Sequence, residues 1–332
     1  MIIIIDSGST QSRLYLLRDE QVIAEKIIAC GVNSNTGTQN QTFRQAIAEG
    51  ITDLLSASQH TVSDVRFAIA SGMITSNLGL LEVPHITAPV SIEQLAAQVV
   101  KVNDRNILPL DLEIRFIPGV KNPLSHSDWQ CLRDIDLMRG EETQAVGLAV
   151  SKKYALPLTM IELGSTTKLI HIDAEGRIVG SITSLSGQVY AAVKKETFIG
   201  ASMADSTDDN EFFSEDILQQ ASNSVEHAGL LRSLLFTRFI QFALPTTATE
   251  RDFFCQAALA ADDMKLFREA QRLGFSYDGE VVIIGKRQRC KIYHSLLVTQ
   301  LNINKPMQLI CDKEEIDSLA IRGACYIASK QS

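Results

Sequence analysis

The stretch IIIIDSGSTQSRLYLL, from Ile2 to Leu17, decides how this chain is divided, because a second version of it, MIELGSTTKLIHI, runs from Met160 to Ile172. Each copy is an apolar run ending in an acid, then one residue, then Gly-Ser-Thr, then a basic side chain and more apolar residues. Short apolar runs separated by turn residues predict strand–turn–strand hairpins. One such turn is a common hairpin, but two copies in equivalent places favour a duplicated domain and a shared function of the turns.

The composition indicates a chain long enough for two domains. It has 332 residues, of which 45% are hydrophobic and 21% charged, and a formal net charge of −8. This acidic balance argues against a general nucleic-acid or anionic-membrane binder, so neither partner is expected. The six cysteines are scattered without a Cys-x-x-Cys pair, which favours free thiols in a reducing compartment. Because Asp6 interrupts the apolar start, the sequence predicts neither a signal peptide nor a membrane span, and we expect a cytoplasmic protein.

The patterns after each hairpin support a duplication of whole domains. The first half predicts a third strand over residues 21–28, followed by helix 42–57, strand 65–70, helix 91–102, strand 113–118 and a helix within 138–155. The second half predicts strands over 158–163, 167–173 and 177–185, helices over 212–225, 230–244 and 250–273, then strand 280–285, helix 287–301, strand 307–311 and helix 314–328. A polar, acidic loop is expected over 201–212. This order implies mixed sheets covered by helices.

The first turn has the residue types of a phosphate-binding loop. Gly8 permits a tight turn and a close backbone approach, and Ser9 and Thr10 add hydroxyl groups beside exposed N–H groups, a combination that binds phosphate oxygens. Asp6, at the end of a buried strand, is expected to be an oxygen ligand for Mg²⁺, directly or through water. Arg13 either neutralises developing charge or points outward from its strand.

The second turn repeats this arrangement. Glu162 takes the place of the acid, Gly164, Ser165 and Thr166 are the expected phosphate contacts, and Lys168 lies just beyond. Two such hairpins facing each other could hold the polyphosphate of one nucleotide. Ligands of two-domain proteins usually bind in the cleft between the halves, so we expect the site there.

The paired hairpins resemble the phosphate-1 and phosphate-2 loops of the sugar kinase, Hsp70 and actin superfamily. The resemblance implies an α/β fold of two duplicated RNase H-like (βββαβαβα) domains, the actin-like ATPase fold, with ATP in an interdomain cleft. It implies an N-terminal domain over residues 1–144, joined by the C-terminal helix 313–330, and a C-terminal domain over 145–312. The superfamily's adenosine-contacting element corresponds to VVIIG, which ends at Gly285.

Further segments narrow the resemblance to one family. DSGSTQSRLYL, ASGMITSNLGLLEVP (70–84), IPGV (117–120), MRGEETQAVG (138–147) and TSLSGQVYAAV (183–193) look like the 2-dehydro-3-deoxygalactonokinases. That family transfers the γ-phosphoryl group of ATP to the 6-hydroxyl of 2-dehydro-3-deoxy-D-galactonate, in galactonate breakdown. The resemblance implies a kinase that uses ATP and Mg²⁺ and acts on a small sugar acid, and a homodimer is kept as one expectation for its assembly. The chain differs from the family at Lys286–Arg289, a basic run where small hydroxyl residues usually follow the adenosine glycine.

The run RGEETQ, from Arg139 to Gln144, supplies the candidate catalytic residues. Exopolyphosphatases of the same superfamily carry a similar Gly-Glu-Glu run, in which a Glu orients the attacking water. By that resemblance Glu141 or Glu142 activates the sugar hydroxyl or holds the Mg²⁺ water, and one of the two is expected to face the cleft because adjacent helical residues point about 100° apart. The alternative is a solvated pair favoured by the helix dipole. Arg139 is expected to bind the substrate carboxylate or to pair with these glutamates.

Two loops at strand ends are the candidate substrate contacts. Gly72 and Met73 would bring backbone N–H groups to the sugar acid and Asn77 would bind its hydroxyls, or else the segment is a loop with ordinary capping residues. Thr183 and Gly187 lie in the equivalent loop of the second domain and are expected to contact the nucleotide or the substrate. Trp129 either helps to line the cleft or is a packing residue, and packing is preferred.

Two other classes of function are compatible with the same turns. A phosphohydrolase acting on polyphosphate or guanosine polyphosphates would use water as acceptor, and predicts phosphate release without a sugar acid. A nucleotide-dependent interaction protein, similar to actin relatives or chaperones, usually carries a peptide-binding domain or polymer-forming insertions, for which no segment is left over. The kinase interpretation is therefore preferred.

Overall fold

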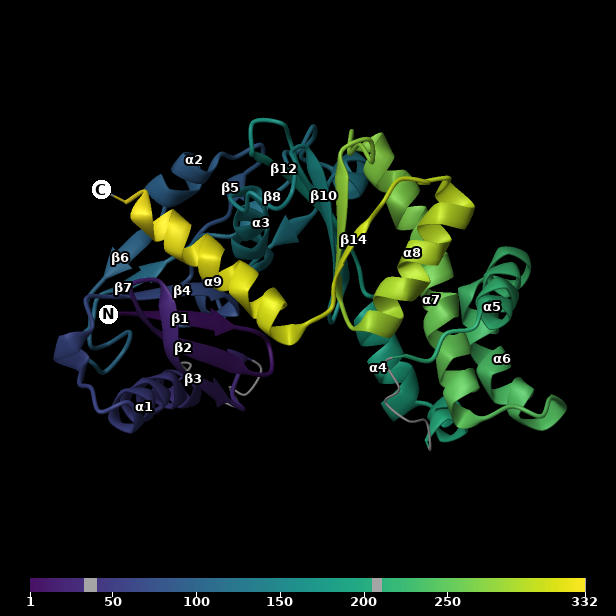
Figure 1. Cartoon of the computed structure of the whole chain (residues 1–332), viewed down its shortest axis with the longest axis horizontal. Coiled ribbons are helices and arrows are strands. Elements are labelled where there is room, and N and C mark those ends of the chain that lie inside the picture. Colours follow the sequence, from purple (N-terminus) through teal and green to yellow (C-terminus); the bar gives the residue numbers. More distant parts are fainter. Residues whose placement is uncertain (33–40, 205–210, 332) are drawn as a thin grey trace. The chain divides into compact units, whose positions relative to one another are not determined.

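The computed structural model describes residues 1–32, 41–204 and 211–331 and separates into two compact units. The first contains Met1–Leu156, Ile172–Gly180 and Asp317–Ser332, and the second contains Pro157–His171 and Ser181–Ile316. Three separate segments of the chain therefore build the first unit, and the last of them contains most of the final helix, α9 (Lys313–Ser329), drawn in yellow in Figure 1. The ligand-binding roles expected for the two domains remain predictions.

A mixed sheet forms the centre of the first unit. Its strands are β1 (Ile2–Ser7), β2 (Ser12–Arg18), β3 (Gln21–Ile28), β4 (Ala68–Gly72), β6 (Val100–Val102) and β7 (Ile114–Phe116), in the order β3-β2-β1-β4-β7-β6. β1 pairs antiparallel with β2 and parallel with β4, which confirms the first hairpin. In this register Asp6 lies opposite Arg13, and residues paired in this way share one face of the sheet.

The helix predicted over residues 91–102 is wrong at its end. α2 (Ile92–Ala97) begins after the N-cap Ser91, whose side chain accepts from the Gln94 N–H, and stops before β6. The valines of β6 pair antiparallel with β7 instead. β-branched side chains suit a pleated sheet better than a helix, and here the sheet partner decides the conformation.

The two faces of the first sheet are covered by different helices (Figure 1). On one face, α1 (Gln41–Ala57) packs against Ile3 and Ile5 in the core of this unit. Side chains alternate along a strand, so Asp6 points to the opposite face. That face is covered by α9 (Lys313–Ser329), one of whose side chains bonds to β2.

α9 also packs closely against α3 (Glu141–Ala149). A Cβ on Gly147 would overlap the Leu319 carbonyl, and a Cβ on Gly323 would overlap the Thr143 carbonyl. Glycine is therefore required on both helices for this approach. The packing keeps the whole of α3 in the first unit, so the change of unit comes after Leu156, later than the boundary expected at residue 144.

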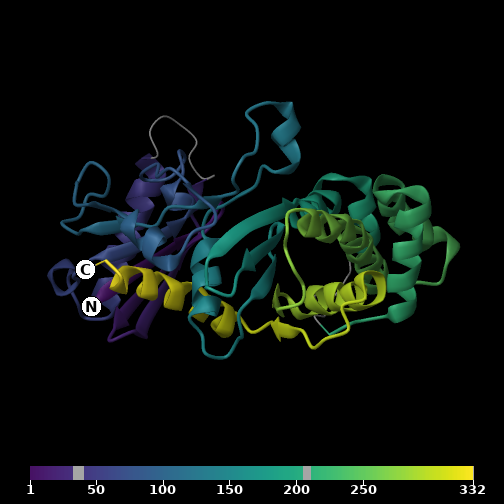
Figure 2. The same ribbon diagram turned by 90° about the horizontal axis from the view of Figure 1, so that it is seen from above.

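A small second sheet completes the first unit. It consists of β5 (Ile86–Thr87), β8 (Val120–Lys121) and β9 (Leu137–Met138). Short 3₁₀ turns lie at Val62–Asp64, Met73–Thr75 and Trp129–Arg133. The last of these lies on the segment between β8 and β9, which projects from the unit (Figure 2). Trp129 is 84% exposed there, so its interpretation as a packing residue was wrong.

The five-stranded sheet that begins with the second hairpin repeats the plan of the first sheet. Its strands are β10 (Leu158–Leu163), β11 (Thr167–Ile172), β12 (Ile178–Ser184), β13 (Glu280–Gly285) and β14 (Gln308–Ile310), in the order β12-β11-β10-β13-β14. As in the first sheet, the opening hairpin lies next to a parallel strand that comes much later in the chain. The predicted duplication of an α/β domain is thereby confirmed.

Helices make up most of the second unit. They are α4 (Ser186–Glu196), α5 (Glu215–Ala228), α6 (Leu230–Ala243), α7 (Ala248–Arg272) and α8 (Arg287–Leu301), with a 3₁₀ turn at Phe198–Met203. α5, α7 and α8 share a core with Ile161, Leu169 and Ile283 of the sheet. Half of the acidic loop expected over 201–212, residues 205–210, lies outside the described residues, and residues 201–203 belong to the 3₁₀ turn.

Two global expectations bear on the environment of the chain. All six cysteines are free thiols, as expected. Within the described ranges, no helix combines the length and the apolar character that crossing a membrane requires.

Candidate active site

The first turn connects β1 to β2 as a tight hairpin. The Gly8 N–H donates to the Gln11 carbonyl at 2.9 Å, and the backbone of Ser9 and Thr10 lies so close to Gly31 that a Cβ there would overlap it. Gly8 and Thr10 are exposed and Ser9 is half-buried, so ligands can reach the turn. Binding of phosphate by these residues remains a prediction.

An ion-paired arginine lies beside the predicted metal ligand. Arg13 Nη1 is 3.1 Å from Asp317 Oδ1 and 3.8 Å from Asp6 Oδ2. Arg13 therefore lies against α9 instead of pointing away into solvent. Asp317 was not predicted, and its only signal in the sequence is an acid on the apolar side of the last helix.

The surroundings of Asp6 suit a cation. Burial raises the pKa of the Asp6 carboxyl; Arg13 opposes this shift, whereas Asp317 and Glu141 add to it. Among the residues that the structure describes, no three His, Cys, Asp or Glu side chains gather into a metal-binding cluster. In phosphoryl-transfer sites Mg²⁺ is usually held by one or two carboxylates together with substrate phosphates, so a single acid in an acidic setting fits that kind of site.

The two glutamates at the start of α3 have different surroundings. Glu141 is half-buried, and its Oε2 accepts the Arg139 backbone N–H at 3.0 Å. Glu142 is fully buried; its Oε2 accepts the Gly140 N–H at 2.7 Å, and its Oε1 has no hydrogen-bond partner among the described residues. Burial, and then the charge of Glu141, raise the pKa of Glu142 to about 8. Glu141 is accessible and close enough to Asp6 to influence its pKa, whereas Glu142 is a buried group that holds a proton at neutral pH.

Three segments of the first unit meet backbone to backbone at this place. Gly72, with φ of 83°, ends β4 and leaves no room for a Cβ beside the Ser7 carbonyl. Gly140, with φ of 116°, precedes α3, and a Cβ on it would lie 3.2 Å from Gly72 Cα. These contacts bring together the end of β1, the end of β4 and the start of α3. The structure thus brings Asp6, Gly72 and the glutamates to one place, and their roles there remain predictions.

The Arg139 guanidinium binds groups within its own unit. Its Nη1 donates to the carbonyl and the hydroxyl of Thr75, both at 2.5 Å, and its Nη2 donates to the Val83 carbonyl at 3.0 Å and approaches His85 Nδ1 at 3.1 Å. It therefore ties together the two ends of the loop over residues 75–83. Burial lowers the pKa of Arg139, and Glu142 opposes this shift. Binding of a substrate carboxylate by Arg139 remains a prediction.

The candidate substrate residues after β4 differ in their exposure. Asn77 is exposed on the loop that Arg139 ties down. Met73 is half-buried and packs against the core of the first unit, so its side chain is a structural part of the loop. Of these two side chains, Asn77 is the one that a ligand can reach directly.

The second turn is closely surrounded by its neighbours. A Cβ on Gly164 would overlap the Glu162 carboxylate, and a Cβ on Gly187, at the start of α4, would overlap the Gly164 carbonyl. Gly285, with φ of 152°, ends β13, and a Cβ on it would lie 3.0 Å from the Leu163 carbonyl oxygen. The structure therefore gathers at one turn Gly164 and Gly285, which are predicted to bind the nucleotide, and Gly187, which is predicted to contact the nucleotide or the substrate.

The other predicted residues of the second unit divide into exposed and buried ones. Ser165 is exposed and Thr166 is half-buried on the turn itself. Lys168 is only 4% exposed, and its Nζ donates to Thr183 Oγ1 at 2.8 Å. A phosphate contact by Lys168 and a nucleotide or substrate contact by Thr183 remain predictions.

A buried acid near the second turn was not predicted. Asp263 of α7 accepts hydrogen bonds from the Ser184 and Ser186 hydroxyls, both at 2.5 Å, and from the Tyr293 hydroxyl at 2.6 Å. The signal in the sequence is an acid within the apolar stretch FFCQAALAADDM. A sequence pattern shows that such an acid needs partners but not which helix supplies them.

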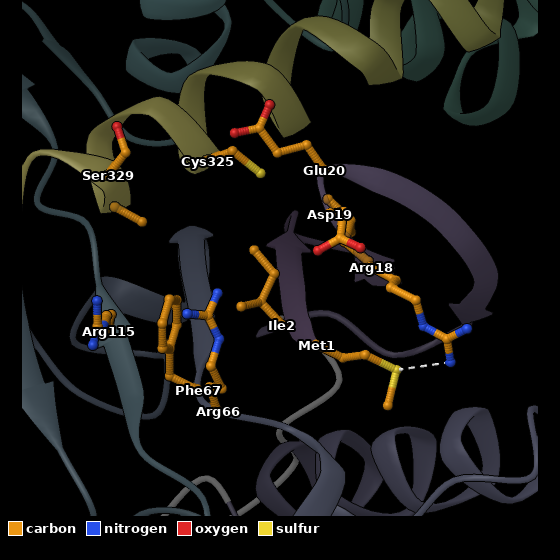
Figure 3. Close-up of a pocket in the computed structure, with 12 residues that line it drawn as sticks. Met1, Ile2, Arg18, Asp19, Glu20, Arg66, Phe67, Arg115, Cys325 and Ser329 are labelled. Carbon is orange, nitrogen blue, oxygen red and sulfur yellow. Dashed lines mark hydrogen bonds between the residues drawn. The ribbon is translucent and has the colours of Figure 1, made fainter.

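A separate cavity lies at the other end of the first sheet (Figure 3). It measures about 600 Å³ and is lined among others by Ile2, Phe67, Arg115 and, on α9, Cys325. Ile2 and Phe67 lie at the N-terminal ends of β1 and β4. Ligands of open α/β sheets bind at the carboxyl ends of the strands, where Asp6 lies, so this cavity is not assigned to the reaction.

Comparison with known proteins gives one consistent group of matches. The profile of the 2-keto-3-deoxy-galactonokinase family matches residues 6–309. A protein of Rhizobium meliloti strain 1021, described as a 2-dehydro-3-deoxygalactonokinase, is 26% identical over 234 residues, which cover 70% of this chain and 69% of the relative. The 2-dehydro-3-deoxygalactonokinase of Escherichia coli strain K12 is 27% identical over 204 residues, which cover 60% of this chain and 59% of the relative.

A solved structure matches over nearly the whole chain. It is a Sinorhizobium meliloti protein described as a 2-dehydro-3-deoxygalactonokinase, with a TM-score of 0.72 and 21% sequence identity, and the match covers 99% of this chain and 98% of that one. At this level of identity the likeness concerns the fold. It agrees with the duplicated α/β architecture described above.

Proposed function

This chain belongs to the 2-keto-3-deoxy-galactonokinase family, and from that premise we propose that it transfers the γ-phosphoryl group of ATP to the 6-hydroxyl of 2-dehydro-3-deoxy-D-galactonate or a closely related sugar acid. The reaction is a phosphoryl transfer to an alcohol group within galactonate breakdown. The observation that carries the proposal is the gathering of Asp6, Arg13 and Glu141 near the end of β1. Phosphoryl transfer requires alignment, charge neutralisation and a base, and these residues can supply each.

Asp6 would hold Mg²⁺ in this proposal, with the phosphates supplying further ligands. When bound, Mg²⁺ neutralises charge that develops on the transferred phosphoryl group. Arg13 lies between Asp6 and Asp317. It would place a positive charge beside the transferred phosphoryl group. Gly8, Ser9 and Thr10 would contact phosphate oxygens through backbone N–H and hydroxyl groups.

Glu141 is the better candidate for the base that takes the proton of the sugar hydroxyl. It is half-buried and near Asp6, whereas Glu142 has no exposed surface. Glu142 would act indirectly, by accepting the Gly140 N–H and so fixing the turn from which α3 begins.

The second unit would bind the nucleotide. Gly164, Ser165 and Thr166 would contact phosphates, and Gly285 allows the end of β13 to approach the same turn. For the sugar acid, Gly72 and Asn77 are the expected contacts. Arg139 supports that loop through its bonds to Thr75 and Val83.

An ATP-coupled assay across a panel of 2-keto-3-deoxy sugar acids tests the proposal. We expect acceptor-dependent formation of ADP with the galactonate-derived acid or a close stereoisomer, and little ADP without an acceptor. Hydrolysis of ATP or of polyphosphate that no sugar acid stimulates would instead favour the phosphohydrolase. In that event the kinase proposal fails.

A further inference from the structure

One arginine of α8 spans the second turn. Arg289 Nη1 donates to the carbonyls of Leu163, at 3.1 Å, and Gly164, at 2.7 Å, and its Nη2 reaches Thr167 Oγ1 at 3.4 Å. Leu163 is the last residue of β10 and Thr167 is the first of β11. A single guanidinium therefore holds both ends of the turn. Arg289 belongs to the basic run Lys286–Arg289 that follows Gly285.

Arg289 is in turn held by a chain of buried hydroxyl groups. The Tyr293 hydroxyl donates its one proton to Asp263, so the Thr167 hydroxyl, 2.9 Å away, must donate to Tyr293. The Thr167 oxygen is then left to accept from Arg289. Thr167, Tyr293 and Asp263 are each at most 6% exposed. Burial and the neighbouring Asp263 raise the pKa of Tyr293, which keeps it a donor.

Asp263 also holds the start of α4, the other element that contacts the second turn. Asp263 accepts from Ser184 and Ser186, which flank the start of α4. The next residue, Gly187, touches the turn, since a Cβ there would lie 2.7 Å from the Ser165 carbonyl oxygen and would overlap the Gly164 carbonyl. Two elements that contact the turn, α4 and α8, are thus tied to one buried carboxylate.

In a turn that binds phosphate, it matters that the backbone carbonyl oxygens already accept hydrogen bonds. A free carbonyl oxygen beside a polyphosphate repels it, whereas a carbonyl bound to a guanidinium is held in place by a charge-assisted hydrogen bond. Positioning errors of about 1 Å can cost roughly 100-fold in rate or binding, so a fixed turn has functional value.

We propose that Arg289, held by Thr167, Tyr293 and Asp263, is a positioning residue that fixes the second turn in the shape that receives the phosphates of the nucleotide. This rests on the proposed function, which assigns ATP phosphates to Gly164, Ser165 and Thr166. The network lies entirely in the second unit, so its effect falls on ATP and not on the sugar acid.

The matched comparison is Arg289→Met against Arg287→Met. Both remove one positive charge from the start of α8, but Arg287 is exposed and pairs with Glu211, with its Nε 3.1 Å from Oε1. We expect Arg289→Met to raise the KM for ATP roughly 10- to 100-fold. The KM for the sugar acid should stay within about twofold in both variants, and Arg287→Met should leave the KM for ATP within about twofold. Equal effects of the two substitutions on ATP would show simple charge attraction and would overturn the proposal.

If Arg289→Met does not fold, Tyr293→Phe tests whether the buried hydroxyl groups hold Arg289 in place. It keeps Arg289, the ring and every charge, and removes only the hydroxyl between Thr167 and Asp263. We expect a rise of about 3- to 10-fold in the KM for ATP, because the hydrogen bonds of the Tyr293 hydroxyl to Thr167 and Asp263 are lost but Arg289 remains, with the KM for the sugar acid unchanged. A KM for ATP equal to that of the unmodified chain, or a parallel change for both substrates, would contradict the network.

Direct binding separates this inference from the proposed function. ATP binding by each variant is measured by calorimetry without a sugar acid. If no sugar acid is phosphorylated but Arg289→Met and Tyr293→Phe still weaken ATP binding relative to Arg287→Met, the kinase proposal fails and the positioning role stands. If the kinase is active but ATP binding and the KM for ATP are unchanged in both variants, the positioning role fails.

Discussion

Two adjacent carboxylates, Glu141 and Glu142, have the same chemistry and opposite environments. Which of them is the base could not be decided from sequence, because both follow the same glycine at the start of one helix. Burial separates them: Glu142 is enclosed, with no partner for its Oε1 in the part of the chain that the structure describes, and Glu141 remains half-buried near Asp6. Each environment has its own measurable consequence.

For Glu141, removal of the carboxylate should slow the chemical step. We expect Glu141→Gln to lower kcat by ~10²–10⁴-fold, because the sugar hydroxyl loses its proton acceptor. The KM for ATP should change little, since the residue is not assigned to nucleotide binding. Steady-state kinetics with Glu142→Gln as the matched variant checks this. If Glu142→Gln shows the larger loss of kcat, the assignment of the base must be reversed.

For Glu142, the consequence is a pH-dependent stability. Its pKa rises from the ordinary value of 4.5 to about 8 on folding, so folding takes up a proton between these values. The stability linked to this group is fully present below about pH 4.5 and is lost as the pH rises through 8, at about 1.4 kcal/mol for each unit of pKa difference. Glutamine does not titrate. The melting temperature of Glu142→Gln relative to the unmodified chain should therefore increase from pH 5 to pH 9, and a constant difference across this range would contradict the raised pKa.

At the scale of elements, the helix crossing of α3 and α9 depends on glycine. Gly323→Ala would drive a methyl group into the Thr143 carbonyl, so the helices must move apart. We expect a loss of about 1–3 kcal/mol in the free energy of unfolding, as for overpacking in a core. Urea unfolding measures it.

Gly50→Ala in α1 is the matched control for this prediction. The atoms nearest to the new methyl group there belong to the Ile28 and Leu14 side chains, which can move, and not to backbone. The intrinsic gain of alanine over glycine in a helix, about 1 kcal/mol, partly offsets the crowding. We expect Gly50→Ala to cost clearly less than Gly323→Ala, and equal losses would show that the helix crossing has no special requirement.

Local sequence patterns predicted some helices and strands well and others poorly. The hairpins at Asp6 and Glu162 were predictable because their strands, turns and strand partners are neighbours in sequence. Val100–Val102 was predicted as the end of a helix, because its pairing partner β7 comes later in the chain and periodicity does not reveal it. Gly147 and Gly323 likewise gave no sign in the sequence that their helices touch.

At the scale of the whole chain, the duplication and the family were predictable, and the side-chain partners were not. Two copies of one hairpin, followed by similar element orders, were sufficient for the fold. The partner of Arg13 is Asp317, which lies 304 positions later, and the second turn is contacted by α4 and α8, both of which are tied to Asp263 of α7. Such pairs are created by how the chain returns on itself, so they follow from topology and not from motif spacing.

The last helix, α9, should be necessary for the first unit to fold. Leu319, Ile321 and Ile327 are each at most 9% exposed, and burying such a side chain contributes about 1.5–3 kcal/mol. Together they approach the whole stability of an ordinary domain, roughly 5–15 kcal/mol. A chain ending at Asp312 should therefore leave the first unit unfolded, while a chain ending at Ser329 keeps α9 and should melt within a few degrees of the full chain. Limited proteolysis with mass spectrometry should place the early cuts of the shorter chain within residues 1–156. Cuts confined to the second unit, or an unchanged melting temperature, would mean that α9 is dispensable for the fold of the first unit.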